Sequence, residues 1–329
     1  MDELRPPEIV AHADWSIRPV GRRIAIARRR GNGWIVSAPV KVDDVATLVG
    51  RLLAEAGEGG TALLGVDFPI GLPAAYAART GIIDFLDWLP GAGAGDWRDF
   101  FLPASTAAEI ALGRPFYPAR PGGTRRQHLI DALGVSCFAD LHRLCDLGEG
   151  RAAASPLFWT MGGNQVGKGA ICGWRDLIVP ARARLAQRVG VWPFDGTLQQ
   201  LLARPGFVIA ETYPGEIYHH FDLGIRGRRR SKRRQDDRRA DAPRLLAVAA
   251  SLGLRLAGEA AAAIADGFGA RKEGEDSFDA MVGLFGMINV LRGNRAEGAP
   301  EIPLIRSVEG WILGQRAAGA TIEIGLPRP

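Results

Sequence analysis

Apolar and polar positions in the first part of the chain follow the period of β-strands. The segment 9–14 (IVAHAD) is a short apolar run, and 22–30 (RRIAIARRR) alternates basic and apolar residues, as a half-exposed strand does. The glycine-containing turn at 31–33 leads back into 34–40 (WIVSAPV), which predicts a partner strand. We therefore expect the chain to begin with an antiparallel meander of three strands.

A one-faced helix and a buried strand follow the meander. In 43–57 (DDVATLVGRLLAEAG) apolar residues recur at helical spacing, with Asp43 or Asp44 as the N-cap and a glycine as the stop. The run 61–66 (TALLGV) then has the composition of a buried strand, and Asp67 stands where it ends. The predicted order of strand, strand, strand, helix, strand indicates an α/β fold.

Regular alternation is lost between about residues 74 and 205. This stretch has helical patches at 74–81 and 98–113, a loop rich in proline, glycine and arginine, and a glycine cluster. We expect a single domain over 1–329, with 74–205 as a large helical and loop insertion that decorates one edge of the sheet. The pattern resumes with a strand at 207–210, two alanine-rich helical segments and a long closing helix that a glycine stops.

Carboxylates end three of the strand runs, and two more share one face at the start of the closing helix. Turn chemistry explains a single aspartate at a strand end, and complementing the helix dipole explains the helix pair. If the sheet brings the strand ends together, however, several like charges crowd one point, which favours a bound cation. Oxygen ligands suit Mg²⁺ or Mn²⁺, and one or two such ions commonly serve phosphodiester hydrolysis. The residues predicted to be catalytic and metal-binding are Asp14, Asp67, Glu211, Asp276 and Asp279.

Three motifs resemble those of a known family. They are VDFPIGLP (66–73), ETYPGEIY (211–218) and DSFDAMVG (276–283). From AHADWS to EGWILGQ, the chain resembles the family called domain of unknown function 429, which is described as predicted nucleases with a ribonuclease H-like fold. The resemblance implies a mixed sheet of three antiparallel strands followed by parallel strands, with helices on both faces. It also implies that the five carboxylates form the acidic site, with Asp14 on the central strand as the bridging ligand.

Two further segments carry basic residues that could hold phosphate. The sequence GGNQVGKG (162–169) nearly matches a P-loop but has glycine where a Mg²⁺-binding hydroxyl is required. The run RGRRRSKRR (226–234) has seven basic residues in nine, a composition typical of phosphate contact or of a solvated loop. A structural turn remains the alternative for the glycine cluster. The residues predicted to bind phosphate or nucleic acid are Lys168, Arg228, Arg229, Arg230, Lys232, Arg233 and Arg234.

The composition is that of a globular protein, and its net charge is compatible with a polyanionic partner. The 329 residues are 47% hydrophobic and 23% charged, with a net charge of +5 that permits a polyanionic partner such as RNA or DNA. The three cysteines form no CxxC pair, so neither a zinc knuckle nor a disulfide framework is indicated. No apolar run is long enough to span a membrane, and we expect a cytoplasmic protein with reduced thiols.

Two other classes of function remain open besides a metal-dependent nuclease. The chain could be a non-catalytic module of the same fold that binds nucleic acid or protein, although its five carboxylates disfavour this. It could also be an ATP-dependent phosphotransferase, since sugar and acetate kinases share the fold, but those have two duplicated lobes. A single copy of the strand pattern is visible here.

Overall fold

The computed structural model describes residues 5–148, 151–161, 166–226 and 230–317. Its centre is a mixed sheet of eight strands, ordered β6-β7-β5-β1-β2-β3-β8, with β4 pairing with β2 outside this path. The strands are β1 (Ile9–Asp14), β2 (Arg23–Arg30), β3 (Gly33–Val36), β4 (Val40–Lys41), β5 (Thr61–Val66), β6 (Val189–Trp192), β7 (Gly206–Glu211) and β8 (Leu254–Leu256).

Pairing within the sheet confirms the predicted meander and the return of the chain beside it. Strands β1, β2 and β3 are antiparallel neighbours, while β5 lies parallel to β1, and β7 and β6 continue in the same direction. The register pairs Ala13 with Val66, so the two strands end side by side. The aspartates that follow, Asp14 and Asp67, are thereby placed at the same end of neighbouring strands, as expected.

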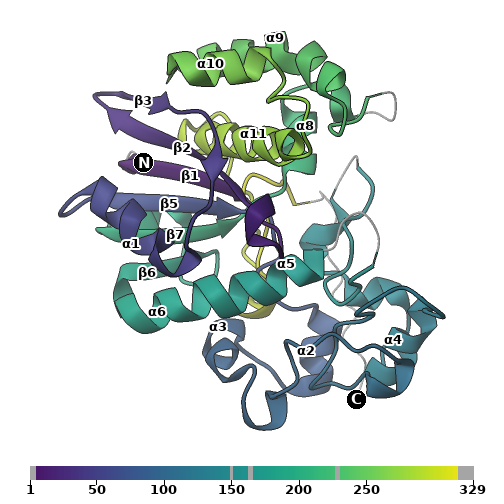
Figure 1. Cartoon of the computed structure of the whole chain (residues 1–329). Coiled ribbons are helices and arrows are strands. Elements are labelled where there is room, and N and C mark those ends of the chain that lie inside the picture. The colour runs from purple at the N-terminus through teal and green to yellow at the C-terminus, as the bar shows by residue number, and fades with distance from the viewer. Residues whose placement is uncertain (1–4, 149–150, 162–165, 227–229, 318–329) are drawn as a thin grey trace.

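Helices cover both faces of the sheet (Figure 1). Along β1, the residues Ile9, Ala11 and Ala13 face one buried core, and Val10 faces the other. The first core packs against α1, α5 and α6, and the second against α8, α9 and α11. The helices are α1 (Val45–Ala56), α2 (Ala74–Thr80), α3 (Phe85–Trp88), α4 (Arg126–Leu133), α5 (Val166–Gly173), α6 (Val179–Leu185), α7 (Leu198–Leu202), α8 (Pro214–His220), α9 (Gln235–Ser251), α10 (Gly258–Ala265) and α11 (Glu273–Leu291).

The ends of the predicted helices have the expected caps. Asp44 is the N-cap of α1 and accepts a hydrogen bond from the amide of Ala46 at 3.0 Å. Gly293, with φ +72°, follows α11 after a single residue and stops it. Among the described residues, no helix has both the length and the apolar composition that crossing a membrane would require.

The segment 74–205 contributes more to the sheet than its sequence indicates. Strand β6 lies within it and forms the sheet edge beside β7. The predicted helical patch at 98–113 is wrong, because only a short 3₁₀ turn forms there, at Ala107–Glu109. Phe100 packs in an aromatic cluster with Trp88 and Trp174, so this apolar residue of the predicted helical patch fills the core from irregular chain.

Candidate functional site

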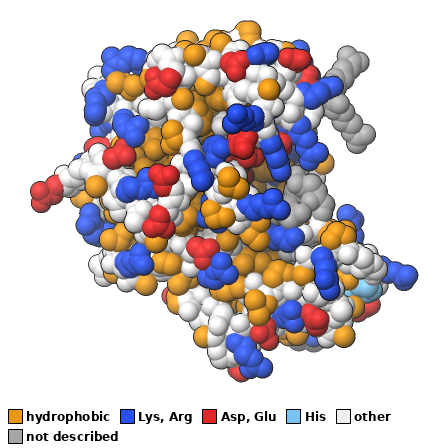
Figure 2. All heavy atoms as spheres, in the orientation of Figure 1, with side chains coloured by type: hydrophobic (Ala, Val, Ile, Leu, Met, Phe, Trp, Pro, Cys, Tyr) orange, Lys and Arg blue, Asp and Glu red, His pale blue; other side chains and the backbone are white. Residues whose placement is uncertain are grey.

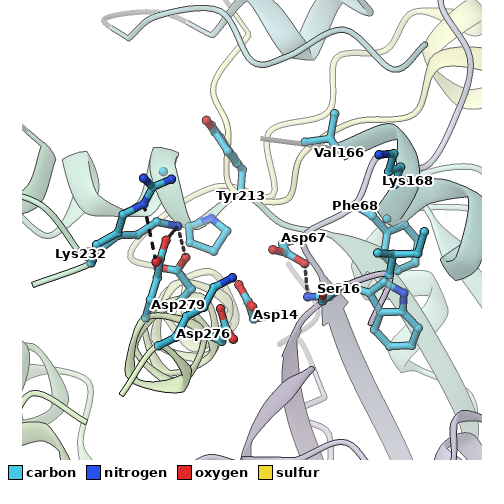
Figure 3. Close-up of a pocket in the computed structure, with 18 of the residues that line it drawn as sticks. Asp14, Ser16, Asp67, Phe68, Val166, Lys168, Tyr213, Lys232, Asp276 and Asp279 are labelled. Carbon is cyan, nitrogen blue, oxygen red and sulfur yellow. Dashed lines mark hydrogen bonds and ion pairs between the residues drawn. The ribbon is translucent and has the colours of Figure 1, made fainter. Parts of the chain in front are cut away.

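A pocket of about 810 Å³ lies at the carboxyl ends of β1 and β5. Five carboxylates and four cationic side chains line it, together with the rings of Tyr213 and Tyr218. The carboxylates of Asp14, Asp67 and the α11 pair lie around its floor, as Figure 3 shows. In the space-filling view, basic side chains surround a small group of acidic ones on the face shown (Figure 2). The pocket therefore joins an acidic floor to a basic surround.

Asp67 makes a backbone contact of the kind expected at a turn and also lines the pocket. Its Oδ1 accepts a hydrogen bond from the amide of Trp15 at 2.6 Å, which is the local backbone contact expected of a turn residue. That amide belongs to the residue after Asp14, however, so the bond ties the end of β5 to the end of β1. Both aspartates line the pocket. The contact holds both aspartates at the pocket floor.

Glycines let α11 approach the sheet closely enough to deliver its acids. A Cβ atom on Gly283 would lie 2.2 Å from the ring of His12 in β1, and one on Gly286 would lie 2.4 Å from Ile217 in the neighbouring helix α8. His12 is fully buried, and its Nε2 lies 2.7 Å from Oγ1 of Thr212. With the helix held this close to β1, Asp276 and Asp279 at its start face the strand ends, as the sequence predicts (Figure 3).

Burial and crowding raise the pKa values of three of the pocket carboxylates. Burial, followed by the charges of Asp67, Asp279 and Asp276, raises the pKa of Asp14 well above its usual range. Burial, with the charge of Asp279, raises the pKa of Asp67 to about 7. Burial and the neighbouring Glu275 raise the pKa of Asp276 to about 6. Without an added cation, the floor of the pocket therefore retains protons near neutral pH.

Asp279 differs from the other three aspartates because both of its oxygens are engaged. The hydroxyl of Tyr218 donates to Oδ1, and the ammonium of Lys232 pairs with Oδ2. Lys232 also lies 3.5 Å from Glu275. Although burial opposes its charge, Asp279 holds the pKa of Lys232 well above its ordinary value. We did not predict Tyr218 as a site residue; its place in ETYPGEIY was the available signal.

Glu211 does not join the pocket, which corrects the expectation that it converges with the aspartates. Its carboxylate accepts two hydrogen bonds from Arg143, both of 2.6 Å, and one of 2.7 Å from the amide of Ile70. Arg143 is fully buried and also pairs with Asp146 at 2.9 Å. Phe207, Ile209 and Glu211 point to the face of the sheet opposite α11, and the alternation of β7 thus directs Glu211 away from the pocket.

The basic run divides between structural pairs and the pocket. Arg228 and Arg229 lie outside the described residues. Arg230 pairs with Asp241 at 2.7 Å and Arg234 with Asp237 at 2.6 Å, so both hold their own segment together. Lys232 and Arg233 line the pocket, and the side chain of Arg233 is 73% exposed. Lys232 and Arg233 therefore lie beside the acidic side chains, and phosphate binding by them stays a prediction.

The glycine cluster forms part of a helix where it is described. Residues 162–165 lie outside the described part, and α5 contains the rest. A Cβ on Gly167 would lie 2.1 Å from the carbonyl oxygen of Leu157, and one on Gly173 would lie 2.3 Å from the ring of Phe68. These glycines allow close packing of α5 behind the pocket. Lys168 projects from the same helix into the pocket wall (Figure 3).

The donor atoms of the pocket fit a hard divalent cation. Carboxylate oxygens are the ligands that Mg²⁺ and Mn²⁺ prefer, and Mg²⁺ is commonly held by one or two carboxylates with water completing its shell. Asp14 and Asp67 offer such a pair. In the described part of the chain, the group of three or more His, Cys, Asp or Glu side chains whose ligand atoms all lie within 4.8 Å of one another is instead Cys145, Asp146 and Glu211. Because the guanidinium of Arg143 already neutralises that buried group, it is a poor cation site.

A scan against protein-family models, a search of curated proteins and a search of solved structures each found no match to this chain. The chemistry of the pocket is therefore interpreted from its own residues.

Proposed function

We propose that this protein is a divalent-metal-dependent nuclease with a ribonuclease H-like fold, which hydrolyses phosphodiester bonds of RNA or DNA. The observation that carries the proposal is the convergence of Asp14, Asp67, Asp276 and Asp279 in a pocket that basic side chains also line. The order of three antiparallel strands followed by parallel ones, with β1 in the centre, supports the fold assignment.

The acidic floor and the basic surround suit different parts of one substrate. Asp14 and Asp67 would hold Mg²⁺ or Mn²⁺, which when bound would lower the pKa of a water molecule and stabilise the charge on the leaving oxygen. Lys168, Arg233 and Lys272 line the same pocket and would bind phosphates of the strand on either side of the scissile bond. Asp276, whose pKa is raised to about 6, is placed to exchange a proton near neutral pH.

The test is cleavage of labelled single-stranded RNA, single-stranded DNA, duplexes and RNA–DNA hybrids by the full chain, with Mn²⁺, Mg²⁺ or a chelator. We expect metal-dependent cleavage of at least one substrate. Asp14→Asn should abolish it and leave nucleic-acid binding largely intact, because asparagine keeps the shape and loses the charge. Asp43→Asn, at a position whose side chain is 76% exposed, is the matched control.

Two further measurements on the same protein, of nucleic-acid binding and of ATP consumption, separate the other two functions. Tight, salt-dependent binding without cleavage under any metal would make the chain a non-catalytic nucleic-acid module. Consumption of ATP, measured by release of ADP in the presence of Mg²⁺, would make it a phosphotransferase. Either result would overturn the nuclease proposal.

A further inference from the structure

We infer that Lys232 acts as a built-in counter-cation that takes the place of a second divalent ion, so that the pocket binds one metal ion at Asp14 and Asp67. The inference rests on the proposed function, since it concerns the metal content of the same pocket. It begins from the unequal surroundings of the four aspartates.

A second divalent ion would need Asp279 as a ligand. The charge of Asp279 is, however, already neutralised by Lys232. The Asp279 side chain is 4% exposed, and its two oxygens are engaged by Tyr218 and Lys232. A divalent ion could reach it only by displacing one of these partners. In the described residues, by contrast, no ion pair involves Asp14, Asp67 or Asp276.

Lys232 is held in place by its backbone, although lysine side chains are usually mobile. The buried guanidinium of Arg238 donates to the carbonyl oxygen of Lys232, and also to the carbonyls of Gly267 at 2.8 Å and Gly269 at 2.6 Å. On the other side, the amide of Ser231 donates to Asp237 at 2.8 Å. These contacts fix the backbone of Lys232 beside α11, and Asp279 and Glu275 then position its ammonium.

The position of this charge determines what else the pocket can hold. The ammonium of Lys232 pairs with Asp279 and lies 3.5 Å from Glu275, so it occupies the side of the pocket that α11 forms. A fixed positive charge so close to Asp279 repels a divalent ion on that side. Among the described residues, no ion pair engages Asp14 or Asp67, and although Oδ1 of Asp67 accepts from the amide of Trp15, Oδ2 of Asp67 and the carboxylate of Asp14 can coordinate an ion. One divalent ion and one ammonium would then share the negative charge of the floor.

The experiment measures bound Mn²⁺ by the electron paramagnetic resonance signal of the ion left in solution during titration of the full chain. We expect one ion per chain in the wild type and two in Lys232→Met, because Asp279 becomes available beside Asp276. Lys232→Arg keeps the charge and should bind one ion. Lys168→Met, which removes a lysine from the opposite wall of the pocket, should also bind one.

Lys232→Met leaves the buried carboxylate of Asp279 without its cation and could therefore unfold the chain. A second variant keeps the inference testable in that case. Lys232→Met/Asp279→Asn removes both charges and should bind one ion, since the second position then lacks its ligand. Two ions in the wild type, or one ion of unchanged affinity in Lys232→Met, would overturn the inference and leave the nuclease proposal standing. If the numbers of bound Mn²⁺ ions are as expected but no substrate is cleaved, the nuclease proposal is overturned and the inference stands.

Discussion

Replacing Asp67 with asparagine should stabilise the metal-free protein at alkaline pH and leave its stability nearly unchanged in acid. The pKa of Asp67 rises from 3.8 to about 7, chiefly through burial and then through the charge of Asp279. Between these two values the folded chain binds more protons than the unfolded chain, so stability falls as the pH rises. The charge of Asp67 therefore lowers the free energy of unfolding by its full amount above about pH 7 and has no effect on it below about pH 4.

The size of the effect follows from the same shift. A rise from 3.8 to about 7 corresponds to about 4 kcal/mol of unfolding free energy at pH 8. The residue is partly exposed, so solvent screens its charge. We therefore expect Asp67→Asn to raise the free energy of unfolding at pH 8 by about 2 kcal/mol. The asparagine Oδ1 can still accept from the amide of Trp15, so the variant tests the charge and keeps the hydrogen bond.

The assay is urea unfolding of both proteins in a chelator, at pH 4, 6 and 8. Asp43→Asn, at an exposed position, should shift the free energy of unfolding little at any of these pH values. A stability gain that is equal at pH 4 and pH 8, or a loss at pH 8, would refute the argument from charge crowding. Added Mn²⁺ should stabilise the wild type more as the pH rises and have little effect on Asp67→Asn.

Three other changes test separate parts of the structure. Arg143→Met leaves Glu211 buried without its cation and should lower the free energy of unfolding by about 3–5 kcal/mol, measured by denaturant titration; a neutral effect would contradict the ion-pair assignment. Gly283→Ala pushes α11 from the ring of His12, so it should cost about 1–3 kcal/mol and weaken Mn²⁺ binding in the same titration. Arg233→Ala should reduce the salt dependence of nucleic-acid affinity by about one unit of logarithmic slope, and an unchanged slope would place Arg233 outside the binding surface.

The strand ends were predictable from sequence because they depend on local pattern. The apolar runs of β1 and β5 end at Asp14 and Asp67, and two parallel neighbours end at the same edge of a sheet. The helix pair Asp276 and Asp279 shares a face through its spacing alone. These four residues could be grouped before any tertiary contact was known.

Glu211 shows where the pattern gives no answer. The run 206–211 is buried along its whole length, so no alternation marks which side chains face α11 and which face away. Only the pairing of Glu211 with Val66 places it on the opposite face. Its partner Arg143 lies 68 residues away in irregular chain, and nothing in the local sequence connects the two.

The partner of Asp279 was hidden for a related reason. Lys232 stood among seven basic residues, and the sequence does not distinguish the lysine that reaches the pocket from the arginines that pair nearby. Its place is set by Arg238 and by the turn at Gly267 and Gly269. Three-residue β8 was likewise too short to stand out from the segment between two helices.

The Arg143 contacts also bear on how the chain folds during its synthesis. Its guanidinium donates to the carbonyl of Ile70, to Glu211 and to the carbonyl of Glu309, which are 73, 68 and 166 residues away. While a ribosome is still translating, the sheet can pair through β7 long before residue 309 emerges. Until then the guanidinium of Arg143 lacks its contact with the carbonyl of Glu309, and the segment around Arg143 is not fully packed. Closure of the cluster should therefore be among the last events of folding, and a nascent chain halted before residue 309 should be open to proteases near Arg143.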